Sequence, residues 1–156
     1  MAGPTALNKR GTKVKLGGYT FDSRKEADFY QRFVKDTIYP FEVHPRFVLA
    51  ELKDIGSARI SKIVYTPDFV IYRDNTIAHV YDVKNSFGPY GIDASAKLRF
   101  RLFAGIYGIP VEAVVVRKHD FKALAIGVTK MRKQPLIATD FNYGWQEATG
   151  YTEVNK

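Results

Sequence analysis

Two acids stand in stretches of this chain that are otherwise apolar. Asp68 follows Pro67 inside the first stretch, and Asp82 lies two residues before Lys84 near the end of the second. An acid and a lysine on the buried side of a strand cost free energy unless other groups pair with them. A divalent cation and a phosphate group would provide that pairing, so these residues predict metal-dependent chemistry on a phosphate.

The spacing of the residues supports this prediction. Residues 77–84 alternate between two faces of a strand and place Asp82 and Lys84 on the same face, roughly 6.6 Å apart along it. Pro67 is unusual within a strand, so the backbone should bend there and aim the Asp68 carboxylate at a specific place. The alternative is that Asp68 caps a turn on the solvent side.

Hard cations such as Mg²⁺ prefer oxygen ligands in near-octahedral geometry. Asp68 and Asp82 can supply two carboxylates, and the backbone carbonyl of Val83 a third oxygen. Glu26 can hold a metal-bound water or a second ion. Lys84 can pair with the scissile phosphate or orient and activate the attacking water. Taken singly, each of these residues has an ordinary structural explanation.

The first helix is expected in the region 19–36. Asp22 and Ser23 are both good N-caps, and Ser23 with Glu26 fits the S-x-x-E capping box. The helix alone favours a Glu26 side chain that turns back to the Ser23 amide and faces solvent. The acids at positions 68 and 82 favour the opposite orientation, with Glu26 turned inward to join them.

The remaining pattern predicts an α/β fold. Residues 41–52 should form an edge strand interrupted at Pro45, followed by central strands over 59–73 and 77–84. A nearly continuous apolar strand over 111–116 should pair in parallel by a crossover. The order is helix, three strands, helix and strand, in a mixed central sheet flanked by helices.

The helix before this last strand has clear boundaries. Asp93 or Ser95 should cap it, and Gly108 should end it after about Tyr107. The expected buried stripe of this helix consists of Leu98, Leu102 and Ile106. Phe100, Phe103 and Tyr107 should widen it. Lys97 and Arg101 share a face.

The net charge of +8 is concentrated in two segments, 1–25 and 117–133, which is typical of a protein that binds a polyanion. The alternative is a generically soluble basic protein. The absence of cysteine excludes disulfides and zinc–thiolate sites. No apolar run is long enough to span a bilayer, and the first residues lack the apolar region of a secretory signal.

Three segments are expected. Residues 1–18 should form a flexible basic arm in which Lys13 and Lys15 could contact phosphates, and residues 19–117 should form the core. Residues 118–156 should form a C-terminal extension in which 121–128 is either a strand or a short helix. Its aromatic residues should pack on this subunit or a partner rather than stack on bases; they are Phe141, Tyr143, Trp145 and Tyr151.

Pro67-Asp68 followed by Asp82-Val83-Lys84 resembles the motif of the PD-(D/E)XK nucleases, with Glu26 matching their upstream helical glutamate. More narrowly, the chain is similar over residues 13–117 to a phage-encoded nuclease family with the pattern G-x-T-F-D-S-x-K-E-A-x-x-Y, Y-x-x-D-F and D-V-K-G. The matching segments here are GYTFDSRKEA from Gly18, YTPDF from Tyr65, and DVK from Asp82, with Lys97 in the later helix. Asn85 departs from the family glycine.

The resemblance implies a restriction-endonuclease-like core that hydrolyses DNA phosphodiesters with Mg²⁺, for which Mn²⁺ would substitute. The arrangement of Glu26, Asp68 and Asp82-x-Lys84 is similar to that of the phage endonuclease I type of Holliday-junction resolvase. This similarity implies a homodimer that acts on branched DNA in the cytoplasm of a bacterial host. Lys97 and Arg101 are then candidates for phosphate contacts. The alternatives are a sequence-specific restriction-like or transposase-like nuclease, and a DNA-binding protein whose activity has lapsed. His44, His79 and His119 are scattered and make no metal-binding spacing.

Overall fold

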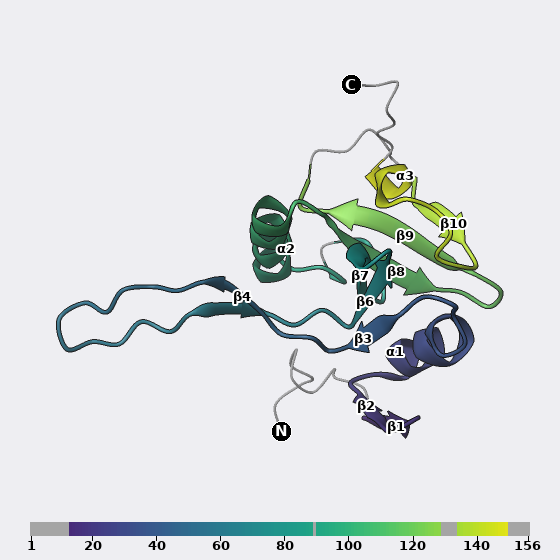
Figure 1. Cartoon of the computed structure of the whole chain (residues 1–156), viewed down its shortest axis with the longest axis horizontal. Coiled ribbons are helices and arrows are strands. Elements are labelled where there is room, and N and C mark those ends of the chain that lie inside the picture. The colour runs from purple at the N-terminus through teal and green to yellow at the C-terminus, as the bar shows by residue number, and fades with distance from the viewer. Residues whose placement is uncertain (1–12, 89, 129–133, 150–156) are drawn as a thin grey trace.

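The computed structural model describes residues 13–88, 90–128 and 134–149. Its centre is a six-stranded mixed sheet in the order β10-β9-β8-β7-β6-β3 (Figure 1). Strands β7 and β8 are parallel, and the other neighbours are antiparallel. The strands are β3 (Phe41–Val43), β6 (Phe69–Arg73), β7 (Thr76–Val83), β8 (Val111–Val116), β9 (Phe121–Ile126) and β10 (Leu136–Ala138). The predicted α/β class and the parallel crossover to the strand over 111–116 are confirmed.

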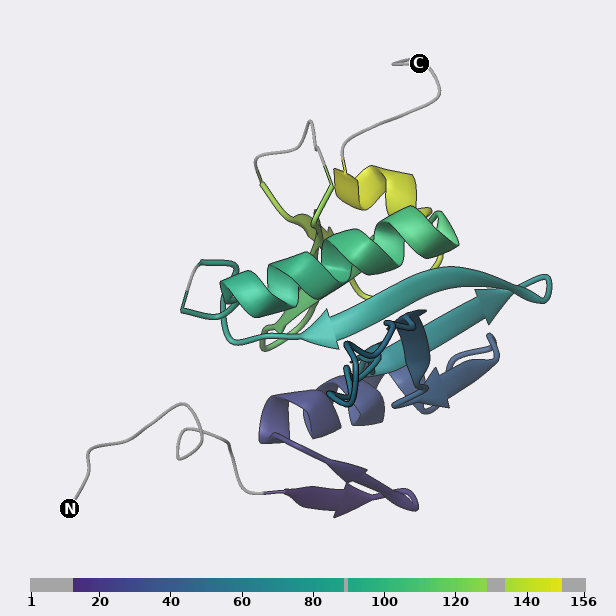
Figure 2. The same cartoon turned by 90° about the vertical axis from the view of Figure 1, so that its left-hand side faces the viewer.

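Helices cover both faces of this sheet, as Figure 2 shows for α1 below and α2 above. The first face carries α1 (Arg24–Phe29), which continues as the π-helix η1 (Tyr30–Val34). The second face carries α2 (Ala94–Tyr107), with the short α3 (Trp145–Thr149) beyond it. In the described residues, no helix is long and apolar enough to cross a membrane.

Each face has its own apolar core. Phe29 of α1 packs against Phe69, Tyr81 and Phe121 with ring centroids 5.1–5.5 Å apart. On the other face, Phe100 and Phe103 of α2 pack on Val80, Val111 and Leu124, among others. The two cores hold β7 between them, so residues on its two faces belong to different surroundings.

The boundaries of α2 agree closely with the sequence. Asp93 is the N-cap and accepts a hydrogen bond from the Ala96 amide at 2.7 Å, and Gly108 ends the helix with a left-handed φ of 72°. The predicted buried stripe is confirmed only in part. Leu98 and Ile106 are 54% and 50% exposed.

Phe100 and Phe103, which the sequence predicts to widen that stripe, form its buried centre, whereas Tyr107 is 41% exposed. Phe100 and Phe103 are 1% and 0% exposed, and both ring centroids lie 5.6 Å from that of Tyr65. Aromatic rings bury more area than leucine, and the segments 47–50 and 63–65, outside the central sheet, offer Phe47 and Tyr65 as edge-on partners on this face. The aromatic contacts therefore decide how the helix is rotated.

The N-terminal segment is partly ordered as a hairpin of β1 (Val14–Leu16) and β2 (Tyr19–Phe21). The expectation of a flexible arm over 1–18 therefore does not hold for residues 14–16, and residues 1–12 lie outside the described part. Helix α1 begins at Arg24, so residues 19–21 are strand where the sequence predicted the start of a helix region. Val14 and Leu16 pack against the core on the α1 side.

Two short strands, β4 (Phe47–Ala50) and β5 (Ile63–Tyr65), form a separate antiparallel pair that projects from the body (Figure 1). The expected single strand over 59–73 is therefore divided. Its first part, β5, pairs with β4, and its second part, β6, enters the central sheet. The chain bends at Thr66–Asp68 between them, which confirms the bend predicted from Pro67.

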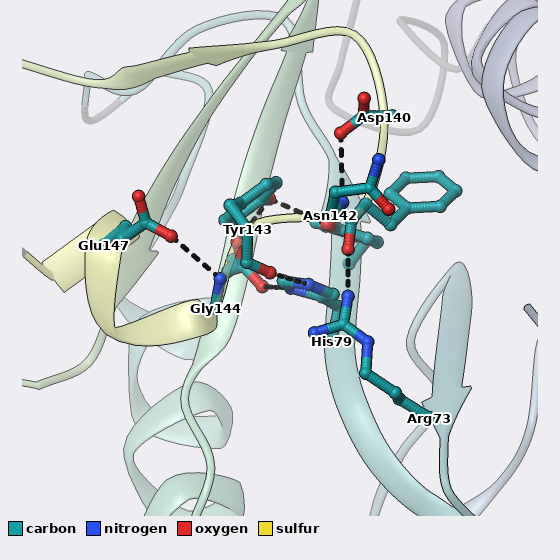
Figure 3. A network of polar contacts seen from close by, with 10 residues as sticks. Arg73, His79, Asp140, Asn142, Tyr143, Gly144 and Glu147 are labelled. Atoms are coloured by element: carbon teal, nitrogen blue, oxygen red, sulfur yellow. Dashed lines mark hydrogen bonds and ion pairs between the residues drawn. The ribbon is translucent and has the colours of Figure 1, made fainter.

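The described part of the C-terminal extension is built into the same sheet and the same core. Residues 121–126 form strand β9, which pairs with β8 along its whole length. Phe141 is 1% exposed, and Tyr143 reaches the buried His79 (Figure 3). Phe141 therefore packs within the protein, as predicted, and does not offer its ring for stacking on bases. Tyr151 lies outside the described residues.

Candidate metal and phosphate site

The predicted residues meet in one pocket of about 320 Å³ at the end of β7. Helix α1 supplies Glu26, the bend before β6 supplies Asp68, and the end of β7 supplies Asp82, Val83 and Lys84. The remaining lining residues come from the start of α1 and from the loop that precedes α2; they are Asp22, Ser23, Lys25, Asn85, Tyr90 and Gly91. Three separate segments thus converge on one hollow.

The end of β7 fixes Asp82 and Lys84 side by side, as the alternation predicted. Lys84 Nζ lies 3.1 Å from Asp82 Oδ1, and the Tyr65 hydroxyl donates a hydrogen bond to Asp82 Oδ2 at 2.7 Å. Lys84 Nζ also lies 5.9 Å from the centroid of Phe100. Burial, followed by the charge of Asp82, raises the pKa of Tyr65 well above its ordinary value, so Tyr65 stays a donor to this carboxylate.

Asp68 is held by backbone contacts with its neighbours. Its Oδ2 accepts a hydrogen bond from the Val83 amide at 2.7 Å, and its own amide donates to the Tyr81 carbonyl at 3.1 Å. Burial raises the pKa of Asp68 well above its usual range, and repulsion from Asp82 and Glu26 adds to this shift. The surroundings of Asp68 in the pocket therefore disfavour the charged form of this carboxyl.

Glu26 turns inward, as the other acids required. Ser23 acts as the N-cap of α1 by accepting a hydrogen bond from the Glu26 amide at 3.1 Å, while the Glu26 side chain is buried and contacts His44 Nε2. The hydrogen bond to Glu26 is the main reason that the pKa of His44 is raised. His44 lies between β3 and β4 with a φ of 54°, and its amide donates to the Asp68 carbonyl at 3.0 Å.

Three potential ligands lie especially close together at the edge of the pocket. One ligand atom from each of Asp22, Glu26 and His44 lies within 4.8 Å of the others. Among the described residues, no other group of three histidine or acidic side chains brings its ligand atoms this close together. The predicted ligands Asp68 and Asp82 belong to the same pocket but are not part of this tight group. Glu26 is the residue that the two sets share.

The four basic residues predicted to contact DNA lie outside the pocket lining. Lys97 and Arg101 are exposed on α2, and Lys15 is exposed on β1. Lys13 Nζ forms an ion pair with Asp22 Oδ1 at 2.8 Å, so part of its charge is directed toward an acid at the pocket rim. The basic residues that do line the pocket are Lys84, which was predicted, and Lys25, which was not.

The sequence analysis also missed His44, Tyr65 and Tyr90. Tyr65 was present in the Y-x-x-D-F pattern but was given no role, although its hydroxyl contacts Asp82. His44 was set aside because its spacing to the other histidines has no metal pattern. The available signal was its place directly before Pro45, at the interruption of a strand.

Comparisons with known proteins give one result. No curated protein and no solved structure matches the chain. A family profile described as "Protein of unknown function (DUF1064)" matches residues 8–119, which is well over half of the chain and includes every residue named above as a possible metal or phosphate contact in the pocket. The chain therefore belongs to the DUF1064 family of proteins of unknown function.

Proposed function

We propose that this protein is a Mg²⁺-dependent endodeoxyribonuclease with a restriction-endonuclease-like core. The observation that supports this most strongly is the single pocket that gathers Glu26, Asp68, Asp82 and Lys84 from three segments. Within the central sheet, the order of α1, then β3, β6 and β7, then α2 and β8 is also the order expected for that core. The β4–β5 pair is an insertion into it.

The residues of the pocket fit a hard cation. Asp68, Asp82 and the backbone carbonyl of Val83 are the oxygen donors that would hold Mg²⁺, with Glu26 as a further carboxylate. The raised pKa of Asp68 fits this assignment, because burial and the nearby acids Asp82 and Glu26 disfavour its charged form, and a bound cation would offset that cost. When bound, such an ion would stabilise the negative charge that develops on the phosphate during hydrolysis.

The protein's own groups have separate tasks in this proposal. Lys84 offers a cation next to Asp82, where it can hold the scissile phosphate or orient the attacking water. Tyr65 fixes the rotamer of Asp82, and His44 fixes that of Glu26. No side chain has to act as a covalent nucleophile, because water attacks the phosphorus directly.

We propose branched DNA as the substrate and a homodimer as the active form, as in phage junction-resolving enzymes. A two-fold symmetric pair of sites matches the two strands that must be cut in a four-way junction. The positive net charge of +8 would attract such a polyanion. In this proposal, Lys97 and Arg101 on the exposed surface of α2 hold phosphates outside the pocket.

The decisive test compares three substrates. The protein is incubated with Mg²⁺ or Mn²⁺ and a four-way junction, a linear duplex or a single strand, and the products are separated on a denaturing gel. Paired symmetric nicks at the junction alone would support a resolvase. Cutting at one duplex sequence would instead support a restriction-like or transposase-like nuclease, and tight binding without cleavage by either metal would support a lapsed enzyme.

A further inference from the structure

The β4–β5 pair is the base of a hairpin, residues 47–65, that extends away from the body (Figure 1). Residues 51–59 are all exposed. At its tip, Ile55 and Ala58 exchange backbone hydrogen bonds of 2.9 and 2.8 Å around a two-residue turn. Gly56 has a φ of 58° at the first turn position, which is the glycine position of a type II′ hairpin.

Both ends of this hairpin are fixed at the candidate site. His44, which contacts Glu26, lies three residues before β4, and Tyr65, which donates to Asp82, is the last residue of β5. The base is held against α2, where the Phe47 ring lies 5.1 Å from Phe103. The hairpin therefore projects from the edge of the pocket with its root held in place.

The projecting part has no core of its own. An isolated two-stranded hairpin is marginally stable, so a partner that covers it would add order. The tip side chain Ile55 is 72% exposed and Leu52 is 44% exposed. The hairpin contains three basic and two acidic side chains, and Arg46 directly before it is a fourth basic residue; the basic residues within the hairpin are Lys53, Arg59 and Lys62.

We propose that this hairpin inserts into the major groove of a DNA duplex whose backbone lies in the pocket. The major groove of B-DNA accommodates a two-stranded β-ribbon, and its floor presents thymine methyl groups that an apolar residue such as Ile55 can contact. The excess of basic residues favours the phosphates on both sides of the groove. This inference rests on the proposed function. The duplex next to the cleaved bond would then contact the enzyme at two places, the pocket and the hairpin.

A second copy of this chain is the competing occupant. The cores of protein–protein interfaces are depleted of charged residues. In the hairpin, Lys53 and Asp54 separate the apolar residues Leu52 and Ile55, and in an extended segment Leu52 would share a face with Asp54 and Ile55 with Lys53, so neither face is continuously apolar. Asp54 also has an internal role, because its Oδ1 accepts a hydrogen bond from the Ile60 amide at 2.9 Å. The charge pattern favours DNA.

The first test removes charge from the hairpin in an Asp82→Asn background, in which bound DNA should stay intact. The hairpin variant changes Lys53, Arg59 and Lys62 to Gln. The control variant changes Lys35, Lys118 and Lys122 to Gln, which removes the same charge near η1 and the β8–β9 turn, away from the hairpin. These two regions are adjacent, because Arg32 of η1 donates to the Arg117 carbonyl.

Affinity for a duplex of about 30 base pairs is measured by fluorescence anisotropy over a range of salt concentrations. The hairpin variant should bind at least about tenfold more weakly, and its slope of log K against log salt should fall by roughly two to three. The control variant should lose clearly less affinity than the hairpin variant, because it removes general positive charge and no contact in the groove. Equal losses in the two variants would overturn the inference, because net charge alone would then explain them.

The second test locates the tip in the DNA. The chain contains no cysteine, so Ser57→Cys introduces a single thiol at the exposed turn. Duplexes carry a thiol tether either on thymine C5, in the major groove, or on guanine N2, in the minor groove. Disulfide cross-links to the C5 tether alone are expected. Cross-links to the N2 tether, or only between two copies of the protein, would overturn the groove assignment.

Failure of this inference can be told apart from failure of the proposed function. If the unmodified protein cleaves DNA while the hairpin variant matches the control, only the groove contact is wrong. If the unmodified protein neither binds nor cleaves any of the DNA substrates, both proposals fall. If the hairpin variant instead converts a dimer to a monomer in light scattering, the hairpin's partner is a second copy.

Discussion

Two glutamate–histidine pairs lie in the same fold, and their surroundings differ completely. Glu26 and His44 meet at the edge of the pocket, where the His44 side chain is 29% exposed. Glu112 and His79 meet in the core, where both side chains are 0% exposed. The pairs have the same chemistry, so the comparison isolates the effect of what surrounds them.

The core pair has partners only within the protein. His79 Nδ1 lies 2.5 Å from Glu112 Oε2, and His79 Nε2 donates to the Tyr143 carbonyl at 2.9 Å (Figure 3). The Tyr143 hydroxyl donates to Glu112 Oε1 at 2.6 Å and lies 2.7 Å from the hydroxyl of Tyr81. These contacts join the C-terminal segment to β7 and β8, so the pair has a structural task.

The pocket pair belongs to a cluster of acids that lies at one pocket. Glu26 adds to the repulsion that raises the pKa of Asp68, after burial and Asp82. Buried polar groups that are fully partnered stabilise one arrangement, whereas clustered acids facing a hollow leave room for an external cation. The comparison teaches that burial of ionisable groups alone does not identify a site.

The largest expected effect is on catalysis at Asp82. Asp82→Asn should lower cleavage by at least about 1,000-fold while DNA affinity changes little, because the amide removes a metal-binding charge without changing the shape of the pocket. Single-turnover cleavage and anisotropy measure the two quantities. Asp74→Asn, in the exposed β6–β7 turn, is the matched control. Retained turnover in Asp82→Asn would remove this residue from the mechanism.

The next effect is on stability at the core pair. His79→Ala leaves Glu112 buried without its partner, which should cost about 3–5 kcal/mol and lower Tm by about 10 °C. Calorimetry measures the loss, and His119→Ala in the exposed β8–β9 turn is the control. Cleavage per folded molecule should be unchanged at low temperature. A large fall in activity without a fall in Tm would contradict the structural role.

Replacing His44 should affect activity and hardly affect stability, in contrast to replacing His79. His44→Asn removes the partner of Glu26 but keeps a residue that tolerates the positive φ of this position. Activity should fall roughly 10–100-fold, as for other residues that orient metal ligands, with little change in Tm. Full activity together with a Tm loss as large as that of His79→Ala would show that the two pairs do the same task.

The smallest effect is a gain in stability at Asp68. In EDTA, Asp68→Asn should raise Tm by about 2–4 °C, because the amide ends the repulsion from Asp82 and Glu26 and can still accept the Val83 hydrogen bond. Added Mg²⁺ should then stabilise the wild type and leave the variant nearly unchanged. A variant that is less stable than the wild type in EDTA would mean that the carboxylate is already balanced.

The parts of the fold that local sequence specifies were predicted well. The ends of α2 depend on Asp93 and Gly108, each of which acts on backbone groups a few residues away. The bend before Asp68 depends on the adjacent proline. The exposure of Leu98 and Ile106 could not be predicted in this way, because the rotation of α2 is set by ring contacts with Tyr65 and Phe47 on other elements.

The candidate site likewise has features that the local sequence specifies and features that depend on contacts between distant segments. The sequence by itself determined which residue types are out of place, namely Asp68 and Asp82 in apolar stretches and Lys84 beside them. The sequence also predicted that Glu26 turns inward to join them, but only the tertiary structure decided that His44 contacts it, because 18 residues separate the two. A side chain's partner depends on the packing of distant segments, and that packing is a property of the whole core and not of any one stretch.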